Sequence, residues 1–277
     1  MITRFAPSPT GRLHLGHAYS AVLGRRAGNR WLLRIEDLDP GRARAEFVDA
    51  IREDLDWLGL APDGAPTVQS KRVAHYAQAL EQLRSRGLVY PCFCTRADIA
   101  ASLTAPHGDA GSGYPGICRG LADDPARRAA VPHSWRLDAA RTIAKVGLPG
   151  WHEADGKAFA SEPAQIGDAI LARKDAPSSY HLACVIDDAA AGVTQVVRGA
   201  DLRPSTPVQR LLQRLLGLPE PVYLHHALVA HDDGRRLAKR DFAPTLAAMR
   251  AAGVNGPRLA EQLATGLLPT GYSFAEA

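Results

Sequence analysis

The stretch Arg4-Phe-Ala-Pro-Ser-Pro-Thr-Gly-Arg-Leu-His-Leu-Gly-His17 decides the fold, because it joins an apolar segment to a helical one. Residues 2–6 have the pattern of a strand, and residues 17–28 have that of a helix. A Pro/Gly loop between a strand and a helix presents backbone N–H groups and the positive end of the helix dipole. The stretch is therefore typical of a phosphate-binding turn. A plain turn with a helix cap and a core histidine is the alternative, and the stretch alone leaves both open.

Strands and helices alternate on either side of one long interruption. Before it, the pattern predicts a strand at 31–35 and helices at 46–58 and 73–86. Strand, helix, strand and helix at this spacing imply parallel βαβ units. After it, we expect strands at 180–186, 193–197 and 222–225. A helix is expected at 206–216, between the last two strands. The interruption, residues 91–177, contains a Gly/Pro-rich stretch and a short strand at 134–137, and it is predicted to be an insertion.

Composition excludes several classes of protein. The chain has 277 residues, of which 46% are hydrophobic and 22% charged, which suits a globular protein with a substantial core. It has no apolar stretch of 18 residues and no secretory pattern at its start, so we expect a cytoplasmic protein that does not enter a membrane. Eight of the basic residues lie between Arg203 and Arg250, against four acids. Charge alone favours a solvated helix face there over a nucleic-acid surface.

Three of the four cysteines form a cluster in the sequence. Cys92 and Cys94 are too close for an ordinary disulfide, and Cys118 follows 24 residues after Cys94. In a cytosolic protein this spacing favours a metal site, with three soft ligands and the fourth left open between His107, water and another side chain. Reduced free thiols are the alternative. Cys184 lies in a predicted apolar strand and is expected in the core.

Three further segments extend the pattern of the first loop: Arg34-Ile-Glu-Asp-Leu-Asp-Pro40, Val197-Arg-Gly-Ala-Asp-Leu202 and Arg236-Leu-Ala-Lys-Arg240. Together they resemble the class I aminoacyl-tRNA synthetases of the glutamyl subgroup. His14-Leu-Gly-His17 is similar to the HIGH signature of that class, and residues 4–11 resemble the lead-in of the glutamyl members. Residues 236–240 stand in the place of the KMSKS loop. The four blocks occur in the family's order.

The resemblance implies a fold and a division of the chain. The fold is α/β, with the Rossmann-like parallel sheet of class I synthetases, a zinc-containing insertion and a short C-terminal helical segment. Residues 1–90 and 178–225 would form the catalytic domain. Residues 91–177 would form the inserted zinc-binding subdomain. Residues 226–277 would hold the KMSKS-type loop and a truncated helical segment.

The resemblance also implies the substrate sites. Glu36 would bind the α-ammonium of glutamate, and Arg4, Ser8, Tyr180 and Arg198 would surround its two carboxylates, with Phe5, Ala6 and Pro7 beside them. His14, His17 and Lys239 would stabilise charge on the phosphates, and Mg²⁺ would arrive with ATP. The KMSKS-type loop departs from the family in having Arg236 first and Ala238 in place of a serine, while Lys239 is kept. The predicted ATP-binding residues are Gly11, His14, Gly16, His17, Arg236 and Lys239.

The cysteine pattern and the short C-terminal part narrow the resemblance to one branch. In the short glutamyl paralogues the pattern C-x-C…Y-x₃-C aligns with Cys92, Cys94, Tyr114 and Cys118, which implies a structural zinc ion. Only residues 241–277 follow the KMSKS-type loop, so the chain resembles the glutamyl-Q tRNA(Asp) synthetases, which lack an anticodon-binding domain. That resemblance implies a monomer that activates glutamate with ATP without tRNA and transfers it to queuosine in the anticodon loop of tRNA(Asp). Basic residues between 203 and 250 would then contact the RNA.

Two other functions remain open from the sequence. The first is a truncated conventional glutamyl-tRNA synthetase that charges tRNA(Glu). The second is a non-catalytic paralogue that binds tRNA or an adenylate, which the altered loop at 236–240 suggests.

Overall fold

The computed structural model describes residues 1–95, 97–99, 114–235, 237 and 244–275. The predicted ATP-binding residues Arg236 and Lys239, and the alternative metal ligand His107, lie outside this range. Within it, no helix combines the length and the apolar character that crossing a membrane requires.

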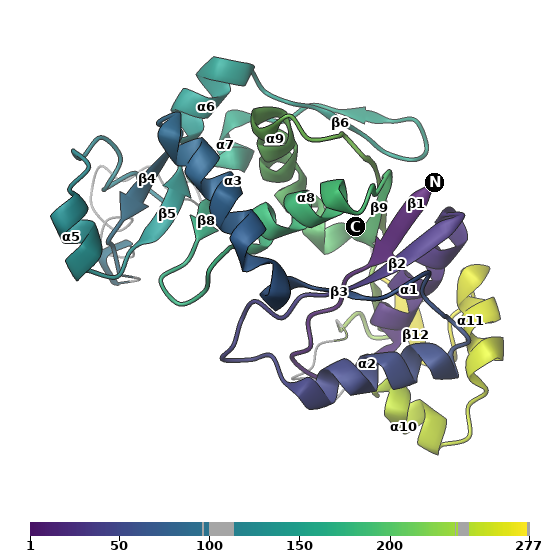
Figure 1. Ribbon diagram of the computed structural model, residues 1–277. Helices are drawn as coiled ribbons and strands as arrows, with labels where there is room; N and C mark the ends of the chain where they lie inside the picture. The colour runs from purple at the N-terminus through teal and green to yellow at the C-terminus, as the bar shows by residue number, and fades with distance from the viewer. Residues whose placement is uncertain (96, 100–113, 236, 238–243, 276–277) are drawn as a thin grey trace.

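Parallel strands made of apolar runs form the centre of the molecule, as expected. β1 (Ile2–Phe5), β2 (Arg30–Ile35) and β3 (Thr67–Val68) pair in parallel in that order. β9 (Gln195–Gly199) pairs in parallel with β10 (Val222–His226). β9 lies beside β1 (Figure 1), where the Thr194 backbone N–H donates to the Ile2 carbonyl at 2.9 Å. The carboxyl ends of β1 and β9 therefore meet at one edge, where ligands bind in open α/β sheets.

The four predicted helices of this part are confirmed, with ends displaced by at most two residues. They are α1 (Leu15–Ala27), α2 (Ala45–Trp57), α3 (Val73–Ser85) and α9 (Thr206–Leu216). Two short 3₁₀ helices precede α3 and α9, namely η1 (Gln69–Arg72) and η2 (Ala200–Ser205).

The strand expected at residues 180–186 is wrong, because this segment is the start of helix α8 (Tyr180–Ala190). The Ser179 side chain caps the helix by accepting a hydrogen bond from the Leu182 backbone N–H. A short apolar run without clear periodicity fits a buried strand and a buried helix equally well, so the sequence did not separate them. The helix continues beyond residue 186, and the turn before β9 is at Ala191 and Gly192. Cys184 is buried as predicted, but on a helix.

The inserted segment forms an antiparallel sheet beside the parallel one. β4 (Val89–Cys92), β5 (Ser134–Leu137) and β8 (Ile170–Ala172) pair in that order, so the strand predicted at 134–137 is confirmed. A hairpin of β6 (Trp151–His152) and β7 (Ala158–Phe159) lies next to β10. From residue 114 on, where the segment is described without a gap, it also contains the helices α5 (Pro125–Ala130), α6 (Ala139–Val146) and α7 (Pro163–Ile166).

The hydrophobic core of the insertion continues into the helices of the second half of the parallel sheet. Leu137 of β5, Leu182 of α8 and Leu211 of α9 belong to one cluster and are fully buried. The insertion is therefore held on α8 and α9 by burial of apolar surface, which is the main stabilising contribution in such an interface.

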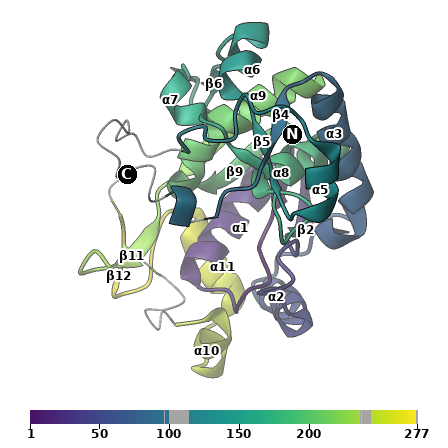
Figure 2. The same cartoon turned by 90° about the vertical axis from the view of Figure 1, so that its left-hand side faces the viewer.

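The C-terminal segment packs against the first helix. β11 (Val229–His231) pairs antiparallel with β12 (Tyr272–Phe274), and α10 (Leu246–Ala251) and α11 (Gly256–Ala264) lie between them in the sequence. α1 and α11 lie side by side in both views (Figures 1 and 2). Leu259 and Leu263 of α11 share a core with Leu15 and Trp31. The domain boundaries expected from the sequence stay a prediction.

Gly256, at the start of α11, allows this helix to approach the end of α2. A Cβ atom there would lie 2.1 Å from the Trp57 carbonyl oxygen. We expect Gly256→Ala to lower the free energy of unfolding by about 1–3 kcal/mol, because backbone rather than a flexible side chain must move. Gly41→Ala is the control, since its nearest neighbour is the tip of Asp39 at 3.3 Å. Equal urea midpoints for the two variants would contradict this account of the packing.

Candidate active site

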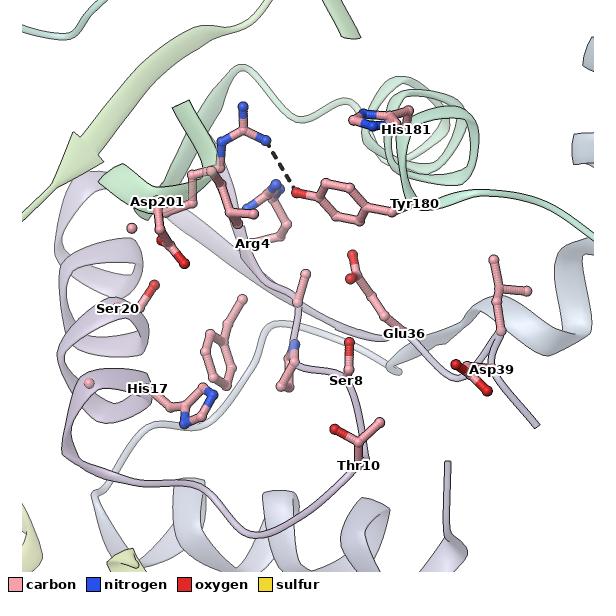
Figure 3. Close-up of a pocket in the computed structure, with 18 of the residues that line it drawn as sticks. Arg4, Ser8, Thr10, His17, Ser20, Glu36, Asp39, Tyr180, His181 and Asp201 are labelled. Atoms are coloured by element: carbon pink, nitrogen blue, oxygen red, sulfur yellow. Dashed lines mark hydrogen bonds between the residues drawn. The ribbon is translucent and has the colours of Figure 1, made fainter. Parts of the chain in front are cut away.

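A cavity of about 1000 Å³ opens at the carboxyl ends of β1, β2 and β9 and at the start of α1 (Figure 3). Its lining residues come from segments as far apart in the sequence as Arg4 and Leu237. Gly11 lies in the loop but does not line the cavity. The residues predicted from the sequence that do line it are Arg4, Phe5, Ala6, Pro7, Ser8, His14, Gly16, His17, Glu36, Tyr180 and Arg198. Their proximity is consistent with a shared site, and their individual roles stay predictions.

Two histidines cap helix α1 at one side of the cavity. His14 Nδ1 accepts from the Gly16 backbone N–H, and His17 Nδ1 accepts from the His14 backbone N–H, both at 3.2 Å. A backbone N–H can only donate, so in each neutral ring the proton is on Nε2. A side chain at position 16 would press on the His14 ring, with its Cβ 3.1 Å from Cε1. Gly16 therefore preserves a cap that places two imidazoles at a helix N-terminus, where anions are stabilised.

On the opposite side, a buried carboxylate joins two arginines. Asp188 Oδ1 lies 3.0 Å from Arg4 Nε and also accepts a short hydrogen bond from Arg34 Nη1. Arg34 continues to Glu36, with Nη2 2.9 Å from Glu36 Oε1. Burial alone would raise the pKa of Asp188, but Arg34 and Arg4 hold it well below its usual value. The network therefore keeps Asp188 ionised and orients Arg4 and Glu36 toward the cavity.

Glu36 provides a carboxylate on this side of the cavity. Its carboxylate and the Ser8 hydroxyl point toward a space bordered by Tyr180 and Arg4 (Figure 3). Burial raises the pKa of Glu36, while Arg34 lowers it. The Glu36 side chain is 11% exposed, and a largely buried carboxylate that borders a cavity is suited to bind a cationic ligand group such as an ammonium.

Arg198 presents a buried positive charge without a carboxylate partner among the described residues. It is 3% exposed, and its hydrogen-bond partners among the described residues are all neutral side chains. Nη1 donates to the Tyr180 hydroxyl at 3.2 Å (the dashed line of Figure 3) and to Gln209 Oε1 at 2.7 Å. Nη2 donates to Thr206 Oγ1 at 2.8 Å, and Nε donates to His225 Nε2 at 3.1 Å. A buried cation held only by neutral acceptors is suited to bind an anionic ligand group.

Sequence reasoning missed the residues that support these groups. Arg34 and Asp188 do not appear in the predicted site, although the acid pair Asp187-Asp188 after an apolar run was a possible signal. With residues 180–186 interpreted as a strand, that pair lay beyond the end of the strand; on α8 both side chains are buried. His181 and Asp201 also line the cavity and were not predicted.

The cysteine cluster is assembled outside this cavity, under the antiparallel sheet. The sulfur atoms of Cys92, Cys94 and Cys118 lie within 4.8 Å of one another. The Tyr114 hydroxyl oxygen lies 3.4 Å from the Cys92 sulfur and 3.5 Å from the Cys94 sulfur. Three thiols and one phenol oxygen thus converge, which is the number of ligands that a structural zinc ion takes.

The basic segment 203–250 does not form one open cationic face among the residues described there. Arg210 is 2% exposed, with Nη2 at 2.5 Å from Glu220, and Arg250 pairs with Glu53 and Asp54. Both side chains are engaged within the protein, which removes them from the set expected to contact RNA. Arg236, Lys239 and Arg240 lie outside the described residues.

Comparisons with known proteins agree with this geometry. The chain matches the family described as tRNA synthetases class I (E and Q), catalytic domain, over residues 1–277. It is 47% identical to a glutamyl-Q tRNA(Asp) synthetase of Rhodobacter capsulatus, over 92% of this chain and 96% of that protein. It is 43% identical to a protein of the same name from Nitratidesulfovibrio vulgaris, over 96% of this chain and 86% of that protein.

A solved structure is also similar. It is that of a glutamate tRNA ligase from Elizabethkingia meningosepticum in complex with its amino acid, with a TM-score of 0.78 and 26% sequence identity. The match covers 95% of this chain and 60% of that chain, so this chain spans somewhat less than two thirds of its solved relative.

Two histidines, the half-buried His181 and His225 with its buried side chain, should make the stability of the protein depend on pH. Burial, with Arg198 adding to it, lowers the pKa of His181 to about 4, and burial likewise lowers that of His225 to about 4. Between about pH 6.5 and pH 4 these histidines bind protons in the unfolded chain but stay neutral in the folded chain. The free energy of unfolding therefore falls as the pH falls through this window. We expect His181→Gln to reduce this slope by up to about 1.4 kcal/mol per pH unit.

Urea unfolding at pH 7, 6 and 5 measures the slope directly. His75→Gln is the control, because His75 is exposed on α3. An unchanged slope in His181→Gln would rule out the buried neutral histidine as its source.

Proposed function

Because this chain belongs to the class I tRNA synthetases (E and Q) and, within them, to the glutamyl-Q tRNA(Asp) synthetase family, we propose that it is an ATP-dependent ligase for glutamate. It activates glutamate with ATP in the absence of tRNA and transfers it to queuosine in the anticodon loop of tRNA(Asp). We propose that it acts as a monomer. The observation that carries the amino-acid assignment is the pair of opposite charges in one cavity, the largely buried Glu36 and the buried Arg198.

The amino-acid subsite follows from these charges. Glu36 binds the α-ammonium group, while Arg198 and Tyr180 bind one carboxylate of glutamate. Arg4 and Ser8 border the same space and bind the other carboxylate (Figure 3). A neutral side-chain amide would leave the charge of Arg198 without a partner, so the subsite prefers glutamate to glutamine.

The nucleotide subsite lies at the start of α1. A carboxylate oxygen of glutamate attacks the α-phosphorus of ATP, and pyrophosphate leaves with the electron pair of the broken P–O bond. His14 and His17 each carry their proton on Nε2 and donate to phosphate oxygens as charge develops there. Mg²⁺ comes with the nucleotide, and Lys239 and Arg236 are proposed to neutralise the phosphates.

Glutamate-dependent exchange of pyrophosphate into ATP, measured without tRNA, tests activation. We expect Arg198→Ala to raise the KM for glutamate roughly 100-fold and to leave the KM for ATP near the wild-type value, because a buried charged hydrogen bond is lost on the amino-acid side only. Arg52→Ala removes an exposed arginine of α2 as a control. A wild-type protein that shows no exchange would favour a non-catalytic paralogue.

Transfer is tested with labelled glutamate and purified tRNAs. We expect tRNA(Asp) that contains queuosine to accept glutamate, and the same tRNA without queuosine not to accept it. Efficient charging of tRNA(Glu) would instead favour a truncated conventional glutamyl-tRNA synthetase.

We also propose that the cysteine cluster binds a structural zinc ion. Cys92, Cys94, Cys118 and Tyr114 would hold it, and the Tyr114 oxygen already bridges two of the sulfurs. An ion here would join β4 to the segment around Cys118, so its contribution is to the folding of the insertion. The ligands lie outside the cavity, which gives the ion no part in the chemistry of activation.

Metal analysis of the purified protein tests this proposal. We expect about one zinc ion per chain, its loss in Cys92→Ser together with a lower thermal midpoint, and weaker retention in Tyr114→Phe. Cys184→Ser is the control, because Cys184 is a buried cysteine far from the cluster in sequence. Equal zinc content in Cys92→Ser and Cys184→Ser would refute the site.

A further inference from the structure

A buried acid–histidine pair contacts Arg198 through the histidine. Glu153 follows β6 in the insertion, and His225 lies on β10. Glu153 Oε1 is 2.6 Å from His225 Nδ1, and Glu153 Oε2 accepts from the His225 backbone N–H at 3.1 Å. Trp151 Nε1 also donates to Glu153 Oε1, at 3.2 Å. The His225 side chain is 0% exposed, so the pair is inaccessible to water.

The hydrogen bonds determine which nitrogen of His225 carries the proton. Burial alone would raise the pKa of Glu153, but hydrogen bonds from His225 lower it, so the carboxylate is ionised and accepts. His225 Nδ1 is therefore the donor to Glu153. In the neutral ring Nε2 is then an acceptor: it receives the Arg198 Nε–H at 3.1 Å and also lies 3.2 Å from the Thr206 hydroxyl oxygen.

We propose that Glu153 and His225 are positioning residues that orient Arg198 for the carboxylate of its amino-acid substrate without neutralising the guanidinium. The inference rests on the proposed function and deepens it, since it names the groups that determine preference for an acidic side chain. A carboxylate in direct contact with Arg198 would form an ion pair and occupy the charge that the substrate needs. His225 places a neutral acceptor in that position and keeps Glu153 one side chain away.

The number of Arg198 N–H groups that have acceptors in the protein supports this positioning role of Glu153 and His225. Arg198 has five N–H groups, and four of them have protein acceptors: His225, Tyr180, Gln209 and Thr206. The plane of the guanidinium is thereby fixed before substrate arrives, which reduces the entropy lost on binding. Arg4 and Arg34 contrast with it, because both are paired with the carboxylate of Asp188.

Glutamate-dependent pyrophosphate exchange in variants of the pair provides the test. We expect His225→Leu to raise the KM for glutamate about 10- to 100-fold, because a hydrogen bond to a charged group is lost. kcat and the KM for ATP should stay within about threefold, and the preference for glutamate over glutamine should fall. His225→Gln retains an acceptor near the Nε2 position and should restore most of the affinity. Glu153→Gln retains an acceptor for Nδ1–H and should also be mild, whereas Glu153→Leu should resemble His225→Leu.

Two further variants control for folding and charge. The double variant Glu153→Leu/His225→Leu removes both polar partners and avoids an unpaired buried carboxylate, so it should fold and show the same rise in KM. Asp155→Asn removes a charge from the exposed turn of the same hairpin, where Asp155 pairs with Lys157, and should be neutral.

The outcomes separate this inference from the proposed function. Exchange in the wild type with an unchanged KM for glutamate in the folded Leu variants would refute the positioning role alone. Equal losses for glutamate and ATP would also refute it, because they would indicate a purely structural contribution. No exchange in the wild type would refute the proposed function and this inference together.

Discussion

The buried carboxylate of Asp188, which lies between the guanidinium groups of Arg4 and Arg34, is the interaction on which the site depends. It joins α8 to β1 and β2, with Asp188 lying 184 positions after Arg4 and 154 positions after Arg34 in the sequence. Taking charges out of water is unfavourable unless each is paired and hydrogen-bonded, so this arrangement is stable only when all three elements are in place. The charges of the site therefore contribute to the assembly of the fold.

The cavity uses buried charge in two different ways. On one side, Asp188 balances Arg4 and Arg34, and Arg34 in turn orients Glu36. On the other side, Arg198 is surrounded by hydroxyl, amide and imidazole acceptors, with Glu153 held behind His225. The first arrangement gives rigidity, and the second leaves a positive charge for a ligand. The insertion takes part in the second, because Glu153 belongs to its hairpin. Under the role proposed for Arg198, the insertion contributes to substrate recognition as well as to packing.

Much of the fold was predictable from local pattern. The loop of residues 4–17, the strands on either side of α1 and helices α2, α3 and α9 have strong periodicity or clear stop signals. α8 was not predictable, because a short apolar run fits both a buried strand and a buried helix. Because of that one error, the burial of Asp188 was not predicted. Its ion pairs with Arg4 and Arg34, the second of which orients Glu36, were therefore not predicted either. The contact between His225 and Glu153 was also not predictable, since nothing in the sequence indicates that a hairpin of the insertion contacts β10.

By itself, the sequence indicated the parallel α/β class and, through the resemblance of its motifs, a set of residues of which most line one cavity. These depend on contacts within a few residues or on motifs with a fixed local geometry. Only the tertiary structure decided which charges are balanced and which are left for a ligand. Asp188 meets Arg4 across 184 positions and Glu153 meets His225 across 72, and burial of such pairs depends on how distant elements pack. Local sequence carries no information on that packing, because pairing and desolvation are properties of the assembled interior.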